Sequence, residues 1–213
     1  MVDWYIYGAG GHGAETMEVL RHMLQANGRT NFVLKFIDDF SKKNKVIGFP
    51  VVGIWDAIPR SLVSIGVGDP NLRAKLLIKA TKAKLRPATI VSPLAFVSEH
   101  AVVEDGCTIA PFSSIQARAH LHRNVSINTG AIITHDVVLN QDSCVSISAN
   151  IAGAARVGER SFIGMGAQIK QGVSIGKSTV VGMGAVVTKD VPDEAICFGN
   201  PAKIKSRRSE KVV

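Results

Sequence analysis

From Val91 to Pro192, aliphatic residues recur at every sixth position without interruption. The first position of each hexad is Val, Ile or Leu, and the fifth is always small: Ala, Ser, Thr, Val or Cys. Neither the period of a strand nor that of an α-helix produces such a repeat. A parallel β-helix does, because each hexad forms one short strand and one corner. The pattern therefore predicts a three-sided β-helix in which three hexads make one coil and the aliphatic positions point inward.

The segment before this repeat follows a different pattern. Apolar runs at residues 4–7, 32–37 and 62–67 predict three strands. One helix is predicted after the glycine-rich residues 8–13, and a second runs from Asp69 and Pro70, as N-cap and first helical residue, to about residue 84. Alternation of strands and helices predicts a parallel α/β sheet. We therefore expect two domains without a long linker: a half-Rossmann βαβ domain (1–88) and the β-helix with its C-terminal tail (89–213).

The glycine-rich segment carries a candidate ligand site. Gly8, Gly10 and Gly13 match G-x-G-x-x-G between a strand and a helix, where backbone N–H groups can approach a phosphate. Asp38 ends the next predicted strand and is placed to accept a hydrogen bond from a ribose hydroxyl. A dinucleotide fold needs two such halves, so one half favours a nucleotide-linked ligand. The alternative is that the glycines only form a tight turn.

Composition narrows the class of protein. The net charge is +8, yet the basic residues are scattered, aromatic residues make up 6%, and no nucleic-acid-reading motif occurs. This favours anionic small molecules over nucleic acid as partners. The three cysteines lack metal or redox spacing, which favours a reducing, cytoplasmic setting. With no apolar run long enough to cross a bilayer and no signal-peptide pattern, we expect no membrane insertion.

The repeat also sorts the histidines. The hexad register places four of them outside the core: His100, His120, His122 and His135. Asp136 follows His135 and can orient the imidazole and raise its basicity. Gly153 lies one coil after His135, so it should sit beside the ring, leave room for a reacting group and expose an N–H. His135 is therefore the candidate general base.

Several segments together resemble one family. These are YGAGGHG at residues 7–13, FIDDF at 36–40, IGVGD at 65–69, the hexapeptide repeats and GNPAK at 199–203. The combination resembles the bacterial sugar O- and N-acetyltransferases of the NeuD/PglD type. The resemblance implies a left-handed parallel β-helix, a homotrimer, acetyl-CoA as co-substrate and no metal. It also implies that the small N-terminal domain holds a nucleotide-linked amino sugar.

The resemblance assigns residues to both substrates. His135 matches the general base with Asp136 beside it, the Gly153 amide matches a donor to the acetyl carbonyl, and Asn128 matches a polar neighbour. The implied sugar-acceptor residues are Gly10, Gly11, His12, Asp38, Asp39, Gly68 and Asp69. The implied acetyl-CoA residues are Cys144, Gly153, Met165, Met183, Asn200, Pro201 and Lys203. Met165 and Met183 are one coil apart, hence stacked, and Cys144 stands where a close relative has His.

We therefore expect a cytoplasmic, acetyl-CoA-dependent N-acetyltransferase acting on a nucleotide-linked 4-amino-4,6-dideoxy sugar in bacterial glycan or polysaccharide biosynthesis. UDP is the favoured carrier, with GDP and dTDP as alternatives. O-acetylation of a sialic acid would use the same base chemistry. More distant alternatives are a non-catalytic nucleotide-sugar sensor and a metal enzyme of the γ-carbonic-anhydrase type that uses His120, His122 and His135.

Overall fold

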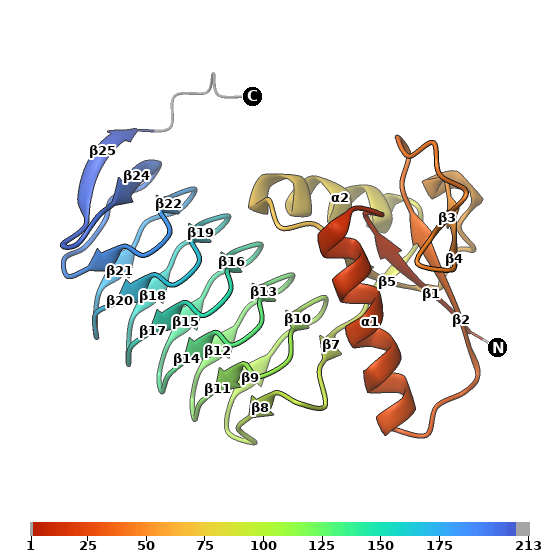
Figure 1. Cartoon of the computed structure of the whole chain (residues 1–213), viewed down its shortest axis with the longest axis horizontal. Helices are drawn as coiled ribbons and strands as arrows, with labels where there is room; N and C mark the ends of the chain where they lie inside the picture. The colour runs from red at the N-terminus through yellow and green to blue at the C-terminus, as the bar shows by residue number, and fades with distance from the viewer. Residues whose placement is uncertain (1, 208–213) are drawn as a thin grey trace.

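An α/β sheet flanked by helices precedes a long stack of coils in the computed structural model, which describes residues 2–207 (Figure 1). The α/β sheet has the strand order β3-β4-β2-β1-β5-β6. Its strands are β1 (Val2–Tyr7), β2 (Phe32–Ile37), β3 (Lys45–Val46), β4 (Phe49–Val52), β5 (Leu62–Ile65) and β6 (Arg86–Pro87). Its helices are α1 (Gly11–Ala26), the short 3₁₀ helix η1 (Ile54–Asp56) and α2 (Pro70–Lys82).

Local sequence accounts for both long helices. Helix α1 buries Met17, Leu20 and Leu24 and starts at the glycine-rich loop. A Cβ at Gly13 would collide with the Gly8 carbonyl, so glycine permits the close approach of α1 to β1. The Asp69 carboxylate caps α2 by accepting a 2.7 Å hydrogen bond from the Leu72 N–H, as predicted. The β3–β4 hairpin was not predicted, and α2 ends slightly earlier than expected.

The hexads form three parallel sheets, one on each side of the β-helix. The first comprises β7 (Ile90–Val91), β10 (Thr108–Ile109), β13 (Ser126–Ile127), β16 (Cys144–Val145), β19 (Phe162–Ile163) and β22 (Val180–Val181). The second comprises β8 (Phe96–Val97), β11 (Ser114–Ile115), β14 (Ile132–Ile133), β17 (Asn150–Ile151), β20 (Gln168–Ile169) and β23 (Val186–Val187). The third comprises β9 (Val102–Val103), β12 (His120–Leu121), β15 (Val138–Leu139), β18 (Arg156–Val157) and β21 (Ser174–Ile175).

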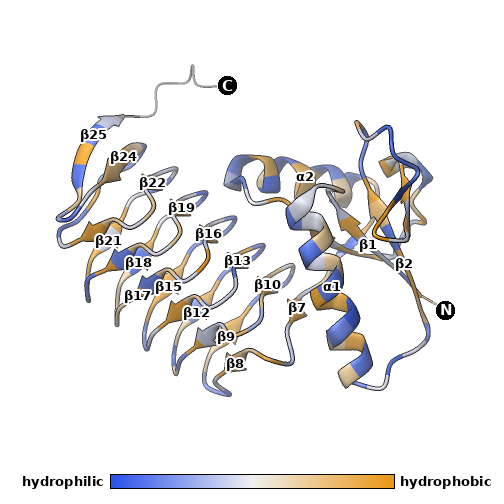
Figure 2. Cartoon of the chain, viewed as in Figure 1, coloured by the Kyte–Doolittle hydropathy of each residue, from blue (hydrophilic) through white to orange (hydrophobic). Residues whose placement is uncertain are grey.

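The predicted inward positions form the core of the β-helix. From Cys107 onward, the first and fifth residues of every hexad are buried, whereas Val91, Val97 and Val103 of the first coil are only partly buried. Figure 2 shows hydrophobic and hydrophilic residues alternating along the coils. Within the three sheets, the hexad strands pair with the strand one coil away in the predicted register, as Ile133 does with Ile151. The β-helix prediction is confirmed.

A buried arginine joins the two parts of the molecule. Arg73 of α2 is fully buried and donates to the carbonyls of Ile65, Val67 and Asn124, at 2.8, 2.9 and 3.0 Å respectively. Asn124 belongs to the β-helix and passes a 2.6 Å hydrogen bond on to Asp142 in the next coil. The expected close packing is therefore present, while the predicted division between residues 88 and 89 stays a prediction.

The C-terminal part closes the last coil. Strand β24 (Ala195–Phe198) continues the first sheet and pairs antiparallel with β25 (Lys203–Arg207). Residues 208–213 of the predicted second domain lie outside the described residues. Within the described chain, no helix has the length and apolar character needed to cross a bilayer.

Candidate active site

His135 lies at the corner between the second and third sheets, where the sequence placed it outside the core. Its Nδ1 is 2.7 Å from Asp136 Oδ2. Arg118, one coil earlier, donates to both carboxylate oxygens of Asp136, at 2.7 and 2.9 Å. The hydrogen bonds from Arg118 and then His135 hold the pKa of Asp136 well below its usual range. Because an ionised carboxylate only accepts, Nδ1 carries the proton and Nε2 keeps a free lone pair.

Gly153 lies against this ring, as the spacing of one coil predicted. A Cβ added at Gly153 would be 2.6 Å from His135 Nε2. Among the described residues no acceptor engages the Gly153 N–H, whereas the adjacent Ala154 N–H donates to the His135 carbonyl. A basic nitrogen and a free backbone donor therefore share one small region of the corner.

A second polar region lies between α1 and the first sheet. A cavity of about 230 Å³ is lined by His12, His22, Thr108, Asn128 and other residues of these elements. His12 Nε2 and Thr108 Oγ1 are buried and have no hydrogen-bond partner within the described residues. Burial, followed by the positive charge of Arg73, lowers the pKa of His12, so its ring is neutral at pH 7. Two unpaired buried polar groups from residues that line one cavity need partners, which a ligand or an ordered water can supply.

The structure brings His12 and Asn128 together but leaves His135 apart from them. Both line the cavity near the corner between the first and second sheets. His135 does not line it and lies at the opposite edge of the second sheet. Within one chain, the predicted base and the predicted acceptor site are therefore separate.

Asp38 closes the glycine loop onto the end of β2. One carboxylate oxygen accepts from the Ala9 N–H at 3.0 Å, and the other from the Phe40 and Ser41 N–H groups. Asp38 therefore shapes the loop that contains Gly10 and Gly11, both of which face open space. Its predicted contact with a ribose stays a prediction and would use the remaining lone pairs.

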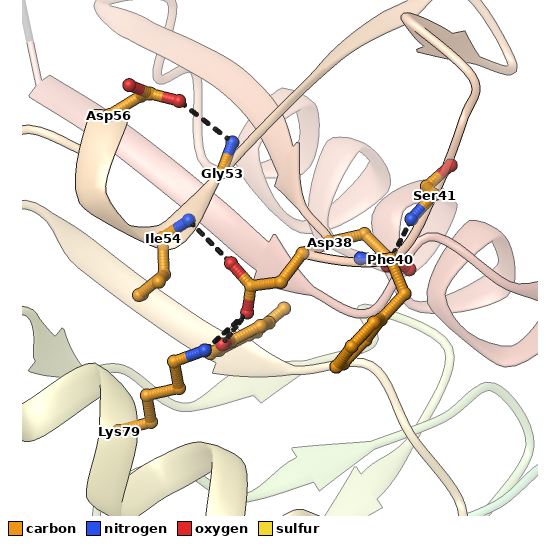
Figure 3. A network of polar contacts seen from close by, with 9 residues as sticks. Asp38, Phe40, Ser41, Gly53, Ile54, Asp56 and Lys79 are labelled. Atoms are coloured by element: carbon orange, nitrogen blue, oxygen red, sulfur yellow. Dashed lines mark hydrogen bonds and ion pairs between the residues drawn. The ribbon is translucent and has the colours of Figure 1, made fainter.

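Asp39 is part of an internal polar network. Lys79 reaches it from α2 at 2.8 Å and the Ile54 N–H donates to it at 2.9 Å, and Figure 3 labels both of these donors. Tyr7 donates its hydroxyl to the same carboxylate at 2.5 Å. Burial alone would raise the pKa of Asp39, but the hydrogen bonds from Lys79 and Tyr7 outweigh it and lower the pKa. Most of this carboxylate is thus already used in holding α2 and η1 to the sheet.

Gly68 and Asp69 lie over the first sheet beside Phe162 and Val180, where they line a separate hollow. With its carboxylate capping α2, Asp69 retains one oxygen for a ligand. Their predicted role in acceptor binding stays a prediction.

The residues predicted for acetyl-CoA divide into two groups. Met165 and Met183 are exposed on adjacent coils, and the Gly184 N–H bonds to the Met165 carbonyl. Asn200 and Pro201 lie in the turn before β25, which Lys203 begins. Cys144, in contrast, is only 3% exposed, and burial raises its pKa to about 11. The Cys144 sulfur is therefore not exposed for the predicted contact with acetyl-CoA, which stays a prediction.

The three histidines of the metal-enzyme alternative are not brought together. His120 and His122 lie at β12, and His135 is at the corner after β14.

Arg118 and Thr108 are the site residues that the sequence reasoning missed. Arg118 could have been found, because it precedes Asp136 by one coil of three hexads. Thr108 gave no signal before the packing of α1 was known.

A β-helix of hexapeptide repeats preceded by a small α/β domain is the architecture of a class of bacterial transferases. Residues 3–80 match the family model of the PglD N-terminal domain, and residues 154–189 match that of the bacterial transferase hexapeptide (six repeats). The chain belongs to the family of hexapeptide-repeat sugar acetyltransferases that carry a PglD-type N-terminal domain.

Solved structures cover nearly the whole chain. The acetyltransferase domain of PglB from Neisseria gonorrhoeae is 30% identical, with a TM-score of 0.88 and coverage of 96% of this chain and 100% of that one. PerB from Caulobacter crescentus, in complex with CoA and GDP-perosamine, is 32% identical, with a TM-score of 0.84 and coverage of 96% and 97%. The left-handed β-helix architecture expected from the sequence is thus shared with these acetyltransferases.

A curated relative points the same way. GDP-perosamine N-acetyltransferase of Escherichia coli O157:H7 is 29% identical over 135 residues. The alignment covers 62% of this chain and 61% of that relative, so the chain spans about three fifths of its length.

Proposed function

We propose that this protein is an acetyl-CoA-dependent N-acetyltransferase that acetylates the amino group of a nucleotide-linked 4-amino-4,6-dideoxy sugar. One observation carries the proposal: the His135 ring lies against Gly153, whose N–H has no acceptor among the described residues, while Asp136 and Arg118 fix the ring. This pairs a base with an oxyanion donor, as direct acyl transfer to an amine requires. The names of the relatives, PglB acetyltransferase domain and GDP-perosamine N-acetyltransferase, support the same chemistry.

The proposed mechanism needs no covalent intermediate. The sugar amine attacks the thioester carbon as His135 Nε2 takes its proton, and the thiolate of coenzyme A leaves. The Gly153 N–H donates to the oxygen of the tetrahedral intermediate. Asp136 stabilises the imidazolium formed at His135, and Arg118 keeps that carboxylate ionised and in place. General-base catalysis of this kind contributes roughly 10²–10⁴-fold.

The acceptor belongs in the cavity beside α1. At about 230 Å³ the cavity is smaller than a typical small-molecule site, roughly 300–1,000 Å³, so it suits part of a nucleotide sugar. The orphaned His12 Nε2 and Thr108 Oγ1 are its proposed hydrogen-bonding groups. The N-terminus of α1 and the open backbone at Gly10 and Gly11 suit the diphosphate.

A homotrimer would complete the site. In one chain the base and the acceptor cavity flank opposite edges of the second sheet, so a neighbouring copy packed on this sheet can bring one to the other. Large apolar side chains are exposed on this sheet and on its corner with the first sheet: Leu94, Phe96, Phe112, Ile132, Ile147, Met165 and Met183. Such a patch is typical of a protein interface. Met165 and Met183 would then border the pantetheine chain.

The test of the activity measures release of free thiol from acetyl-CoA with UDP- and GDP-linked 4-amino sugars as acceptors and a sialic acid as the competing alternative. The sequence favoured UDP as the carrier, whereas the Escherichia coli and Caulobacter crescentus relatives are described with GDP-perosamine. A comparison of kcat/KM for the two acceptors decides between the carriers.

His135→Ala should lower turnover by about 10²-fold or more with the fold intact. Unchanged turnover in this variant would contradict the assignment of the base.

Mixing inactive variants tests the shared site. His135→Ala and His12→Ala chains, co-refolded in equal amounts, should regain about a quarter of wild-type activity if each site uses one residue from each neighbour. No recovery in oligomers shown to be mixed would mean that both residues act from one chain.

A further inference from the structure

A second cluster of histidines lies on the third sheet of the β-helix, separate from the proposed active site. His120 and His122 flank the buried Leu121, at the start of β12 and just after its end, so both rings point outward. Glu104 lies one coil before His122, at the matching position of its hexad. The proposed acetyl transfer uses none of these three side chains.

The three side chains converge on one point. Glu104 Oε1 is 2.8 Å from His120 Nε2 and 2.8 Å from His122 Nδ1. The three ligand atoms all lie within 4.8 Å of one another, and the two rings are stacked with centroids 3.9 Å apart. Ligands at about 2.1 Å from a zinc ion are about 2.9–3.4 Å apart, so a small adjustment of the side chains would seat the metal.

A backbone hydrogen bond orients the Glu104 carboxylate toward the two histidines. The Arg123 N–H donates to Glu104 Oε2 at 3.0 Å, which leaves Oε1 directed at the two rings. Outer hydrogen bonds of this kind orient metal ligands. In the next coil, Asn140 turns its amide to the Val157 carbonyl and does not compete for the histidines. All three ligands are half-buried, with side-chain exposures of 32–39%, so an ion can reach them from solvent.

We propose that Glu104, His120 and His122 bind a first-row divalent transition-metal ion, zinc by the chemistry of the ligand set. Two imidazole nitrogens and one carboxylate oxygen are typical ligands of such ions and poor ligands of Mg²⁺ or Ca²⁺. Binding requires His120 to keep its proton on Nδ1 and His122 on Nε2, and water completes the coordination. The ion ties the first coil, whose inward residues are only partly buried, to the second. Its role is structural and independent of acetyl transfer.

The test measures metal binding by the full chain after treatment with a chelator. Titration calorimetry with ZnCl₂ should show one ion per chain, and CoCl₂ should give the visible d–d absorption of a histidine-ligated site. Glu104→Gln and His122→Gln should weaken binding at least tenfold. His100→Gln is the matched control, because His100 is an exposed histidine on the same β-helix with Glu99 as its carboxylate neighbour at 3.8 Å.

Thermal unfolding gives an independent readout. Zinc should raise the Tm of the wild type and of His100→Gln equally, and should raise the Tm of Glu104→Gln by clearly less at the same zinc concentration. Mg²⁺ should have no effect on any of them. The proposal is overturned if micromolar zinc does not bind, or if the ion binds Glu104→Gln as tightly as the wild type. Glu104→Gln preserves side-chain shape, so it carries the test even if His122→Gln fails to fold, which circular dichroism would show.

Discussion

Replacing Gly153 by alanine should lower activity strongly while leaving the fold almost unchanged. The added Cβ would lie 2.4 Å from His135 Cε1 and 2.6 Å from Nε2, whereas ordinary contacts begin at 3.4 Å. The imidazole must therefore move by about 1.0 Å, and a misplacement of about 1 Å can lower a rate by about 10²-fold. We expect kcat to fall by about this factor.

The effect on stability should be small, because the His135 side chain is 55% exposed and can rotate into solvent. A strained rotamer costs about 0.5–1.5 kcal/mol, which urea unfolding can measure. Gly153 does not have a positive φ, so alanine adds no backbone strain. Thiol release from acetyl-CoA measures kcat.

A double-mutant cycle with His135→Ala separates the two explanations for lost activity. If Gly153→Ala acts by displacing the ring, it should have no further effect when the ring is absent. A second loss of about 10²-fold in the His135→Ala background would refute this reasoning and indicate a direct effect on the thioester or on the Gly153 N–H. Full turnover in the single variant would refute it as well.

Three further predictions concern buried and charged groups. Arg118→Gln removes the two hydrogen bonds that fix the Asp136 carboxylate, so the pKa of Asp136 should rise, the His135 ring should lose its fixed orientation and kcat should fall about tenfold or more. Arg73→Met leaves buried carbonyls unpaired and should lower the free energy of unfolding by about 3 kcal/mol in urea, whereas the exposed Arg29→Met should stay within about 0.5. The unfolded chain protonates His12 near pH 6.5, whereas the folded chain does so only at a lower pH, because burial lowers the pKa of His12. The free energy of unfolding should therefore decrease as the pH falls from about 6.5 to that lowered pKa. His12→Gln should make this decrease smaller in urea titrations.

Each of these predictions has a contradicting outcome. An unchanged kcat in Arg118→Gln would mean that the Arg118–Asp136 pair does not position the base. Equal free energies of unfolding for Arg73→Met and Arg29→Met would mean that the buried Arg73 does not stabilise the packing of the α/β sheet against the β-helix. An unchanged pH slope in His12→Gln would show that another group titrates in that window.

The fold could be predicted because two simple rules cover most of the chain. The hexad states which side chains face inward at every position from Val91 onward, and its stacking in threes brings His135 to Gly153. The same stacking would have led from Asp136 back to Arg118. The β3–β4 hairpin was not predicted, because its short strands have too few residues to show a hydrophobic pattern.

Features that depend on the packing of the α/β sheet against the β-helix could not be predicted. Arg73 reads in the sequence as one more basic residue of a solvated helix, yet it is fully buried against Asn124. Cys144 reads as an outward position, yet the structure buries it. The orphaned Thr108 hydroxyl becomes meaningful only with α1 laid over the first sheet.

The stacking of coils has a consequence for how such a protein can change during evolution. Duplicating or deleting one coil of three hexads keeps every inward position in register, so the architecture tolerates changes in length. The pairs His135–Gly153, Arg118–Asp136 and Glu104–His122, however, each join one coil to the next. A coil inserted between the members of a pair would leave a folded protein without that pair. Length is therefore free to vary only beyond these coils, toward the C-terminal end of the stack.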